Sequence, residues 1–184
     1  MKAAPVALAA LLALAVASPA HAITCPILSD PVGDGRSKLV PVVESPQIDI
    51  VSGNIASGST TVAGTLRVAS LAPDTVSAMH PRWALSFALG ATTHTFGAEI
   101  PLGTGGTPVG SFDGLPLPAG STFTINVTTS TFRWSVPRSA VPELVWDQTF
   151  HSVTASTSVL VSNADAAGTQ AVYLDQTPGC ISAS

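Results

Sequence analysis

Two short acidic segments near the start of the chain contain the residue types best suited to bind a metal ion. The first is Asp30-Pro31-Val32-Gly33-Asp34-Gly35, and the second is Ile48-Asp49-Ile50. Calcium takes about six to eight oxygen atoms from carboxylates, carbonyls and water, which a Pro/Gly turn with nearby aspartates can supply. Asp30, Asp34 and Asp49 are therefore candidate calcium ligands. By spacing alone the alternative is favoured, in which these aspartates only shape turns and bind no metal, because Asp-Pro and Asp-Gly are ordinary turn formers.

The histidines do not fall into a recognisable catalytic pattern. His80, His94 and His151 are scattered along the chain, without a Gly-x-Ser-x-Gly or His-Glu-x-x-His motif. His94 alternates in phase with apolar residues, which predicts a buried imidazole with its hydrogen bonds satisfied. The sequence thus favours a protein that is not an enzyme.

Three tryptophans are candidates for a sugar-stacking surface, since large aromatic rings supply much contact area. Trp83 alternates with Leu85 and Phe87, and Trp134 with Phe132 and Val136, so both are predicted to lie in the core. Trp146 stands next to Asp147 near a predicted strand end. It is the one tryptophan that we expect to be available to a ligand.

The N-terminus has the features of a cleavable signal peptide. A basic start at Lys2 precedes an apolar run from Val6 to Ala17 and the small residues around Ala20 and Ala22. The run is shorter than the roughly 20 residues that span a bilayer, which argues against the alternative of an uncleaved anchor. We expect cleavage after Ala22, secretion, and a single domain over residues 23–184 with no further membrane span.

The two cysteines, Cys25 and Cys180, lie near the two ends of this expected mature chain. An exported pair meets an oxidising environment, and the ends of a domain are often close together. We therefore predict a disulfide between them. Two free buried thiols are the alternative, and neither cysteine has a second one at the spacing of a zinc site.

The overall charge argues against two classes of partner. Seven Lys and Arg residues against eleven Asp and Glu give a net charge of −4, and only 10% of residues are charged. A protein that binds nucleic acid or an anionic membrane surface usually carries a basic excess. We therefore expect no nucleic-acid partner.

The fold class follows from short alternating segments separated by Gly, Pro, Asn and Asp. In residues 82–89, for example, Trp83, Leu85, Phe87 and Leu89 share one face. Such a pattern is typical of strands in two packed antiparallel sheets, a jelly-roll or immunoglobulin-like sandwich. Residues 138–141 are expected to form one helical turn. The predicted strands span residues 47–53, 59–70, 82–89, 92–100, 109–112, 121–129, 131–136, 144–150, 153–162 and 171–175.

Several short motifs resemble those of a family of exported bacterial sandwich domains. The resemblance rests on Asp30-Pro31-Val32-Gly33-Asp34, Ile48-Asp49-Ile50, Val68-Ala69-Ser70-Leu71 and Trp134-Ser135-Val136-Pro137-Arg138, and covers most of residues 28–175. The chain is similar to DOMON-like and family 9 carbohydrate-binding-module-like domains that contain calcium. Relatives often have a second acid or amide after the turn, where this chain has Gly35-Arg36. The resemblance implies a jelly-roll-like sandwich with calcium bound by Asp30, Asp34 and Asp49.

Two hypotheses for the function follow from these observations. In the first, the chain is a secreted, calcium-stabilised, non-catalytic module that binds glycan or another cell-envelope component. In the second, it is a structural or protein-interaction domain without a metal, and its aspartates only shape turns. A hydrolase is the less favoured third hypothesis.

Overall fold

A computed structural model describes residues 28–35, 45–73, 80–101, 106–144 and 150–159, which form two antiparallel sheets of five strands each. Sheet 1 has the order β1-β2-β3-β9-β8, and sheet 2 has the order β10-β4-β5-β6-β7. The strands of sheet 1 are β1 (Leu28–Ser29), β2 (Ile50–Ser57), β3 (Thr61–Val68), β9 (Thr131–Pro137) and β8 (Thr122–Asn126). Those of sheet 2 are β10 (His151–Val159), β4 (Pro81–Leu89), β5 (Thr92–Glu99), β6 (Val109–Phe112) and β7 (Leu115–Pro116).

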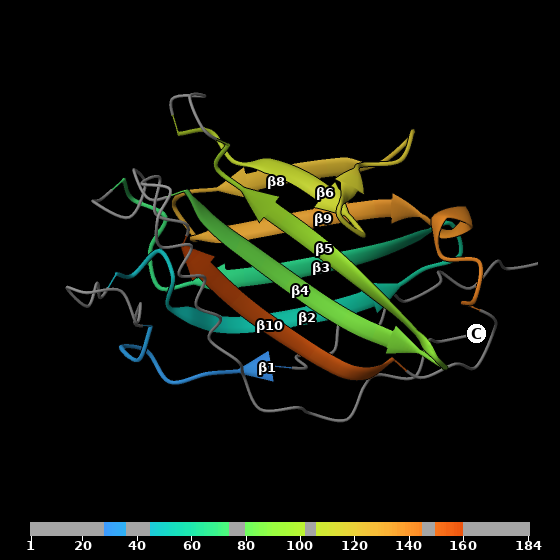
Figure 1. The fold of residues 1–184 in the computed structure, drawn as a ribbon, viewed down its shortest axis with the longest axis horizontal. Coiled ribbons are helices and arrows are strands. Elements are labelled where there is room, and N and C mark those ends of the chain that lie inside the picture. Colours follow the sequence, from blue (N-terminus) through green and yellow to red (C-terminus); the bar gives the residue numbers. More distant parts are fainter. Residues whose placement is uncertain (1–27, 36–44, 74–79, 102–105, 145–149, 160–184) are drawn as a thin grey trace, which may run out of the picture.

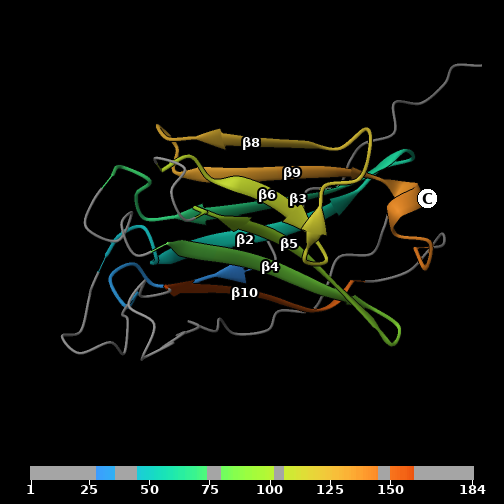
Figure 2. The same ribbon diagram turned by 45° about the horizontal axis from the view of Figure 1, so that its top comes forward.

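The two sheets lie face to face, with β4, β5 and β10 crossing obliquely in front of β2, β3 and β9 (Figure 1). Strands β3 and β9 are antiparallel partners in sheet 1, and the strand that follows each of them along the chain lies in sheet 2. These following strands, β4 after β3 and β10 after β9, are antiparallel partners as well. The edge strands β8 and β10 lie on opposite sides of the molecule (Figure 2). This arrangement confirms the predicted two-sheet antiparallel sandwich.

The core lies between the sheets and follows the alternation in the sequence. Every second residue of β4 is buried, beginning with Pro81, and the same holds for β3 and β9. Trp83 of sheet 2 packs on Phe132 of sheet 1 with ring centroids 4.7 Å apart. The indole N–H of Trp83 donates to Gln47 O at 2.7 Å, and that of Trp134 donates to Gly97 O at 2.8 Å. Both tryptophans therefore lie in the core, as predicted.

Several element boundaries differ from the prediction. The first long strand begins at Ile50 and not at residue 47, because residues 46–48 form a turn. The two-residue strands β1 and β7 were not predicted, while the helical turn expected over 138–141 is the 3-10 helix η2 (Arg138–Ala140). The predicted signal peptide, most of the segment 144–150 and the strand 171–175 lie outside the described residues.

Among the described residues there is no helix with the length and apolarity that a membrane span requires.

Candidate functional site

The N-terminal turn, residues 30–35, lies against the start of β2. Pairing of Leu28 with Gly53 and of Ser29 with Ser52 sets this position, and Asp30 N–H then donates to Val51 O at 3.0 Å. Asp30 is half-buried, and its Oδ2 atom is completely enclosed. The β1–β2 pairing thus brings the first acidic segment next to the second, although 16 residues separate Gly33 from Asp49.

Asp49 holds the N-terminal turn in place. Its side chain is only 4% exposed, and Gly33 N–H donates to its Oδ2 at 2.8 Å. Gly33 has a φ of +101°, a conformation that L side chains rarely adopt. A Cβ atom on Gly35 would lie 2.5 Å from Asp49 Cα, so the chain approaches this closely only because residue 35 is glycine. The two glycines therefore allow the turn to fold onto the Asp49 carboxylate.

Alternation along the strand predicted over residues 47–53 would place Asp49 on the face opposite Ile48 and Ile50, and the burial of Asp49 corrects that expectation. Ile48, Asp49 and Ile50 are all buried, with exposed fractions of 2%, 4% and 0%. Alternation does not apply here because the strand begins only at Ile50. The N-terminal turn also covers the side of Asp49 that would otherwise face solvent.

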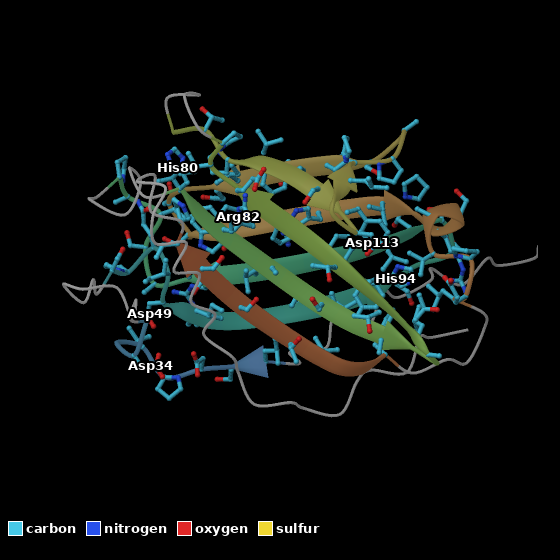
Figure 3. All side chains as sticks on the ribbon, in the orientation of Figure 1. Asp34, Asp49, His80, Arg82, His94 and Asp113 are labelled. Atoms are coloured by element: carbon cyan, nitrogen blue, oxygen red, sulfur yellow. The ribbon has the colours of Figure 1, made fainter. Side chains whose placement is uncertain are left out.

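The three predicted ligands occupy the same end of the sandwich but different environments. Asp34 is exposed, and it lies near Asp49 at the end of the molecule opposite His94 (Figure 3). Asp49 Oδ1 is buried and has no hydrogen-bond partner among the described residues. Within those residues, no group of three or more His, Cys, Asp or Glu is arranged to hold a metal ion. A cation at this turn would therefore need backbone carbonyls and water in addition to carboxylate oxygens.

A second candidate site is the outward face of sheet 1, which the sequence did not single out. Strand pairing aligns outward side chains from four strands into two neighbouring rows, because successive residues alternate between the faces of a sheet. One row is Asn54, Thr65, Arg133 and Thr124, and the other is Ala56, Ala63, Ser135 and Thr122. These eight residues line a shallow hollow of about 440 Å³, here called the sheet 1 groove.

The composition of the sheet 1 groove explains its shape and its chemistry. Two facing alanines, Ala56 and Ala63, leave space at one part of the sheet surface, and the surrounding Thr, Ser and Asn side chains offer hydroxyl and amide groups. Hydroxyls donate and accept hydrogen bonds, whereas Arg133 only donates. The groove therefore offers mixed hydrogen-bonding groups to a polar ligand.

A third feature, at the opposite end from Asp49, is a hydrogen-bonded group around His94 (Figure 3). His94 Nδ1 lies 2.8 Å from Asp113 Oδ2, and Nε2 lies 3.2 Å from Glu143 Oε2. The imidazole is 5% exposed and stacks on Phe112 with centroids 5.6 Å apart. The prediction of a satisfied core histidine is confirmed, and neither ring nitrogen remains available to a substrate.

An apolar pocket of about 390 Å³ opens between the sheets near Gln47. Trp83 and Ile100 contribute to it from the sheet 2 side, and Ile125 from sheet 1. Its lining also includes Pro73 and Gly106, which border residues outside the described ranges.

Three further predicted site residues cannot be placed. Cys25, Cys180 and Trp146 lie outside the residues that the structure describes, so the disulfide and the ligand-binding tryptophan stay predictions. The structure describes the backbone of His151 in β10 but not its side chain.

Neither a protein-family model nor a curated protein sequence matches the chain. The resemblance to DOMON-like and family 9 carbohydrate-binding modules therefore rests on its motif residues alone.

Proposed function

We propose that the chain is an exported, non-catalytic β-sandwich module that binds glycan or another component of the cell envelope. The observation that carries this proposal is the sheet 1 groove, an open hollow lined by hydroxyl, amide and guanidinium groups. Sugars present many hydroxyl groups, which pair with such side chains. The sheet beneath the groove is a rigid platform, because its inward side chains pack in the core.

A matched pair of substitutions tests the position of this site. Ala63→Phe fills the sheet 1 groove, whereas Ala84→Phe places the same ring on the outward face of sheet 2, where Ala84 pairs with Gly97 and Ser156. In a glycan-array screen of the processed protein, we expect binding by the wild type and by Ala84→Phe, and its loss in Ala63→Phe. Equal binding by both variants would remove the groove from the proposal.

The second part of the proposal is that calcium stabilises the N-terminal turn. Support comes from Asp49 Oδ1, which is buried without a hydrogen-bond partner in the described part of the chain. An unpartnered buried carboxylate oxygen is costly, and a bound cation compensates for it. The enclosed Asp30 Oδ2 and the neighbouring turn carbonyls are the other candidate ligands, with Asp34 at the solvent side.

Thermal unfolding in calcium and in EDTA tests this second part. A ligand that binds only the folded state stabilises it by about 2.7 kcal/mol at a concentration 100 times its Kd. We expect calcium to raise the Tm of the wild type, and this rise to disappear in Asp49→Asn, which keeps an acceptor for Gly33 N–H. Asp113→Asn, at the opposite end, is the control and retains the calcium response. An unchanged wild-type Tm across calcium concentrations would leave only the turn-forming role of the aspartates.

A metal-free structural or protein-interaction domain is the alternative function. It is favoured by the hydrogen bond from Gly33 N–H, which already gives Asp49 a turn-forming role. This alternative would be favoured if the glycan screen detected no binding and an identified protein partner were captured.

A further inference from the structure

Two arginines lie side by side on the outward face of sheet 1. Arg67 of β3 pairs with Thr131, and Arg133 of β9 pairs with Thr65, so the two arginines are diagonal neighbours on adjacent antiparallel strands. Residues in this relation are about 7–8 Å apart. Both side chains are exposed, and Arg133 lines the sheet 1 groove while Arg67 stands one row beyond it.

Within the described residues, no acidic side chain balances these two positive charges. The other described arginines are engaged: Arg82 forms a 2.9 Å ion pair with Glu99, and Arg138 donates to Gly58 O and Leu144 O at 3.1 Å each. The side chains of Arg67 and Arg133 have no ion pair or hydrogen bond among the described residues. The outward positions of β2, β3, β8 and β9 also contain no Asp or Glu. This face is therefore locally positive although the chain has a net charge of −4.

Stability of the fold does not account for this pair. Cross-strand pairs stabilise a sheet through apolar, hydroxyl or opposite-charge contacts, whereas like charges repel each other, so this diagonal pair adds no stabilising contact. The same positions elsewhere on this face carry Thr, Ser, Asn or Ala, which favour or tolerate the strand without any repulsion. A ligand with negative charge would give the two guanidinium groups a partner that the described residues do not provide.

The chemistry of the surroundings identifies the class of ligand. A guanidinium group forms two parallel hydrogen bonds with a carboxylate, and hydroxyl and amide side chains suit the hydroxyl groups of sugars. Single-stranded nucleic acid is normally bound by stacking on exposed aromatic rings. The large aromatic residue in the groove lining, Trp134, is only 1% exposed, which argues against that ligand.

We propose that the sheet 1 groove binds an acidic polysaccharide, with uronate carboxylates at Arg67 and Arg133 and sugar hydroxyls along the Thr, Ser and Asn side chains. This inference rests on the proposed glycan-binding function and specifies its ligand. The positive face also accelerates association with a polyanion, and the interaction weakens as salt screens the charges.

Calorimetry with a defined oligogalacturonate and with the same oligomer after reduction of its carboxyl groups tests the proposal. The reduced oligomer keeps the sugar hydroxyls and loses the charge. We expect the wild type to bind the acidic oligomer at least ten times more tightly than the reduced one. Arg67→Gln and Arg133→Gln should each weaken binding of the acidic oligomer about tenfold, and the double variant should weaken it further.

Arg82→Gln is the matched control, because it removes the same charge from sheet 2. We expect its affinity to stay within about twofold of the wild type. Arg133→Lys retains the charge without the planar fork, so we expect an intermediate loss. A Tm of the arginine variants at or above that of the wild type would show that the losses do not come from misfolding.

The outcomes separate this inference from the proposed function. Equal affinity for the acidic and the reduced oligomer, with no effect of the arginine substitutions, overturns the acidic-ligand inference and leaves glycan binding intact. Equally tight binding of an oligonucleotide of the same charge also overturns it, because the face would then attract any polyanion. If neither oligomer nor any array glycan is bound, the proposed function fails together with the inference.

Discussion

Buried polar side chains at the two ends of the sandwich hold segments that are distant in the sequence. Asp49 binds the N-terminal turn through Gly33, and His94 joins the β6–β7 turn to the segment after η2 through Asp113 and Glu143. In each case the polar side chain is itself buried, while its hydrogen-bond partners, Gly33 for Asp49 and the two acids for His94, are partly exposed to water. Such residues fix loops at the ends of a sandwich where apolar packing ends.

At the residue scale, the contribution of His94 can be measured with His94→Phe. Phenylalanine retains the stack on Phe112 and removes both hydrogen bonds to the carboxylates. Hydrogen bonds to charged groups contribute about 1.5–3 kcal/mol, but the acids are 36% and 38% exposed, and their solvation reduces this value. We expect the free energy of unfolding to fall by about 1–2 kcal/mol in urea titrations.

Ser86→Ala is a suitable control for this substitution. It removes one hydrogen bond between two neutral hydroxyls, those of Ser86 and Thr95, which lie 2.8 Å apart on the outward face of the same sheet. We expect a loss of less than about 1 kcal/mol. If His94→Phe were as stable as the wild type, the hydrogen bonds of the imidazole would contribute nothing beyond its ring packing.

Gly64 shows a different kind of constraint on a single residue. A Cβ atom at this position would lie 2.6 Å from Phe96 Cδ2, and Phe96 is itself packed against Phe87, Phe112 and Trp134. The ring has little room to move, and overpacking a core costs about 1–3 kcal/mol. We expect Gly64→Ala to lower the free energy of unfolding by that amount. Gly58→Ala, where the nearest atom is 3.9 Å away, should change it little.

At the scale of elements, the turn between β6 and β7 depends on two residues with positive φ. Asp113 has a φ of +52° and Gly114 a φ of +74°. Two consecutive positive φ values are typical of a type I′ hairpin turn, for which Asp-Gly is a preferred pair. Asp113 also exchanges hydrogen bonds with the backbone of Thr95 at 2.7 and 2.8 Å, so the turn is attached to β5.

Replacement of Gly114 by alanine tests this assignment. No atom lies within 4 Å of the added Cβ, so any effect comes from backbone conformation and not from a clash. A positive φ costs an L-residue about 1–2 kcal/mol. We expect Gly114→Ala to lower the free energy of unfolding by this amount in urea titrations. A neutral result would mean that the hairpin tolerates another turn type.

The same elements show why the sequence predicted most strands and less of the site. In β4 apolar residues alternate without interruption, and in β5 the buried positions His94, Phe96 and Ala98 also alternate, so both strands and their buried faces were predicted. A two-residue strand such as β7 has no period to detect. Asp49 was assigned to the wrong environment because a turn, not a strand, contains Ile48.

Sites built from residues on strands that pair over long sequence distances could not be predicted for a different reason. Arg67 alternates with the buried residues of β3 and so lies on its outward face, but nothing local in the sequence shows that β3 lies next to β9 and brings Arg67 beside Arg133. His94 was predicted to be a satisfied core residue, whereas its partners Asp113 and Glu143 are 19 and 49 residues away along the chain. The burial of a side chain follows from the local pattern of the sequence. Which distant side chains lie next to one another depends on how the strands are ordered in the sheets.

At the scale of the whole molecule, the two sheets share one core and should unfold together. Trp83 of sheet 2 packs on Phe132 of sheet 1, and Phe96 of sheet 2 packs on Trp134 of sheet 1 with centroids 5.9 Å apart. The hydrogen bond from Trp134 to Gly97 O also crosses between the sheets. Separation of the sheets would expose both faces of this core to water, which makes a state with only one folded sheet unfavourable.

Fluorescence from one tryptophan in each sheet can detect whether unfolding is concerted. In a Trp146→Phe background, Trp83→Phe leaves Trp134 as the reporter in sheet 1, and Trp134→Phe leaves Trp83 as the reporter in sheet 2. For each variant we expect the fluorescence transition in urea to coincide with the far-UV circular dichroism transition, as for a two-state domain. If one reporter changed at a lower urea concentration than the dichroism of the same variant, its sheet would unfold separately. The shared aromatic core would then not hold the two layers together.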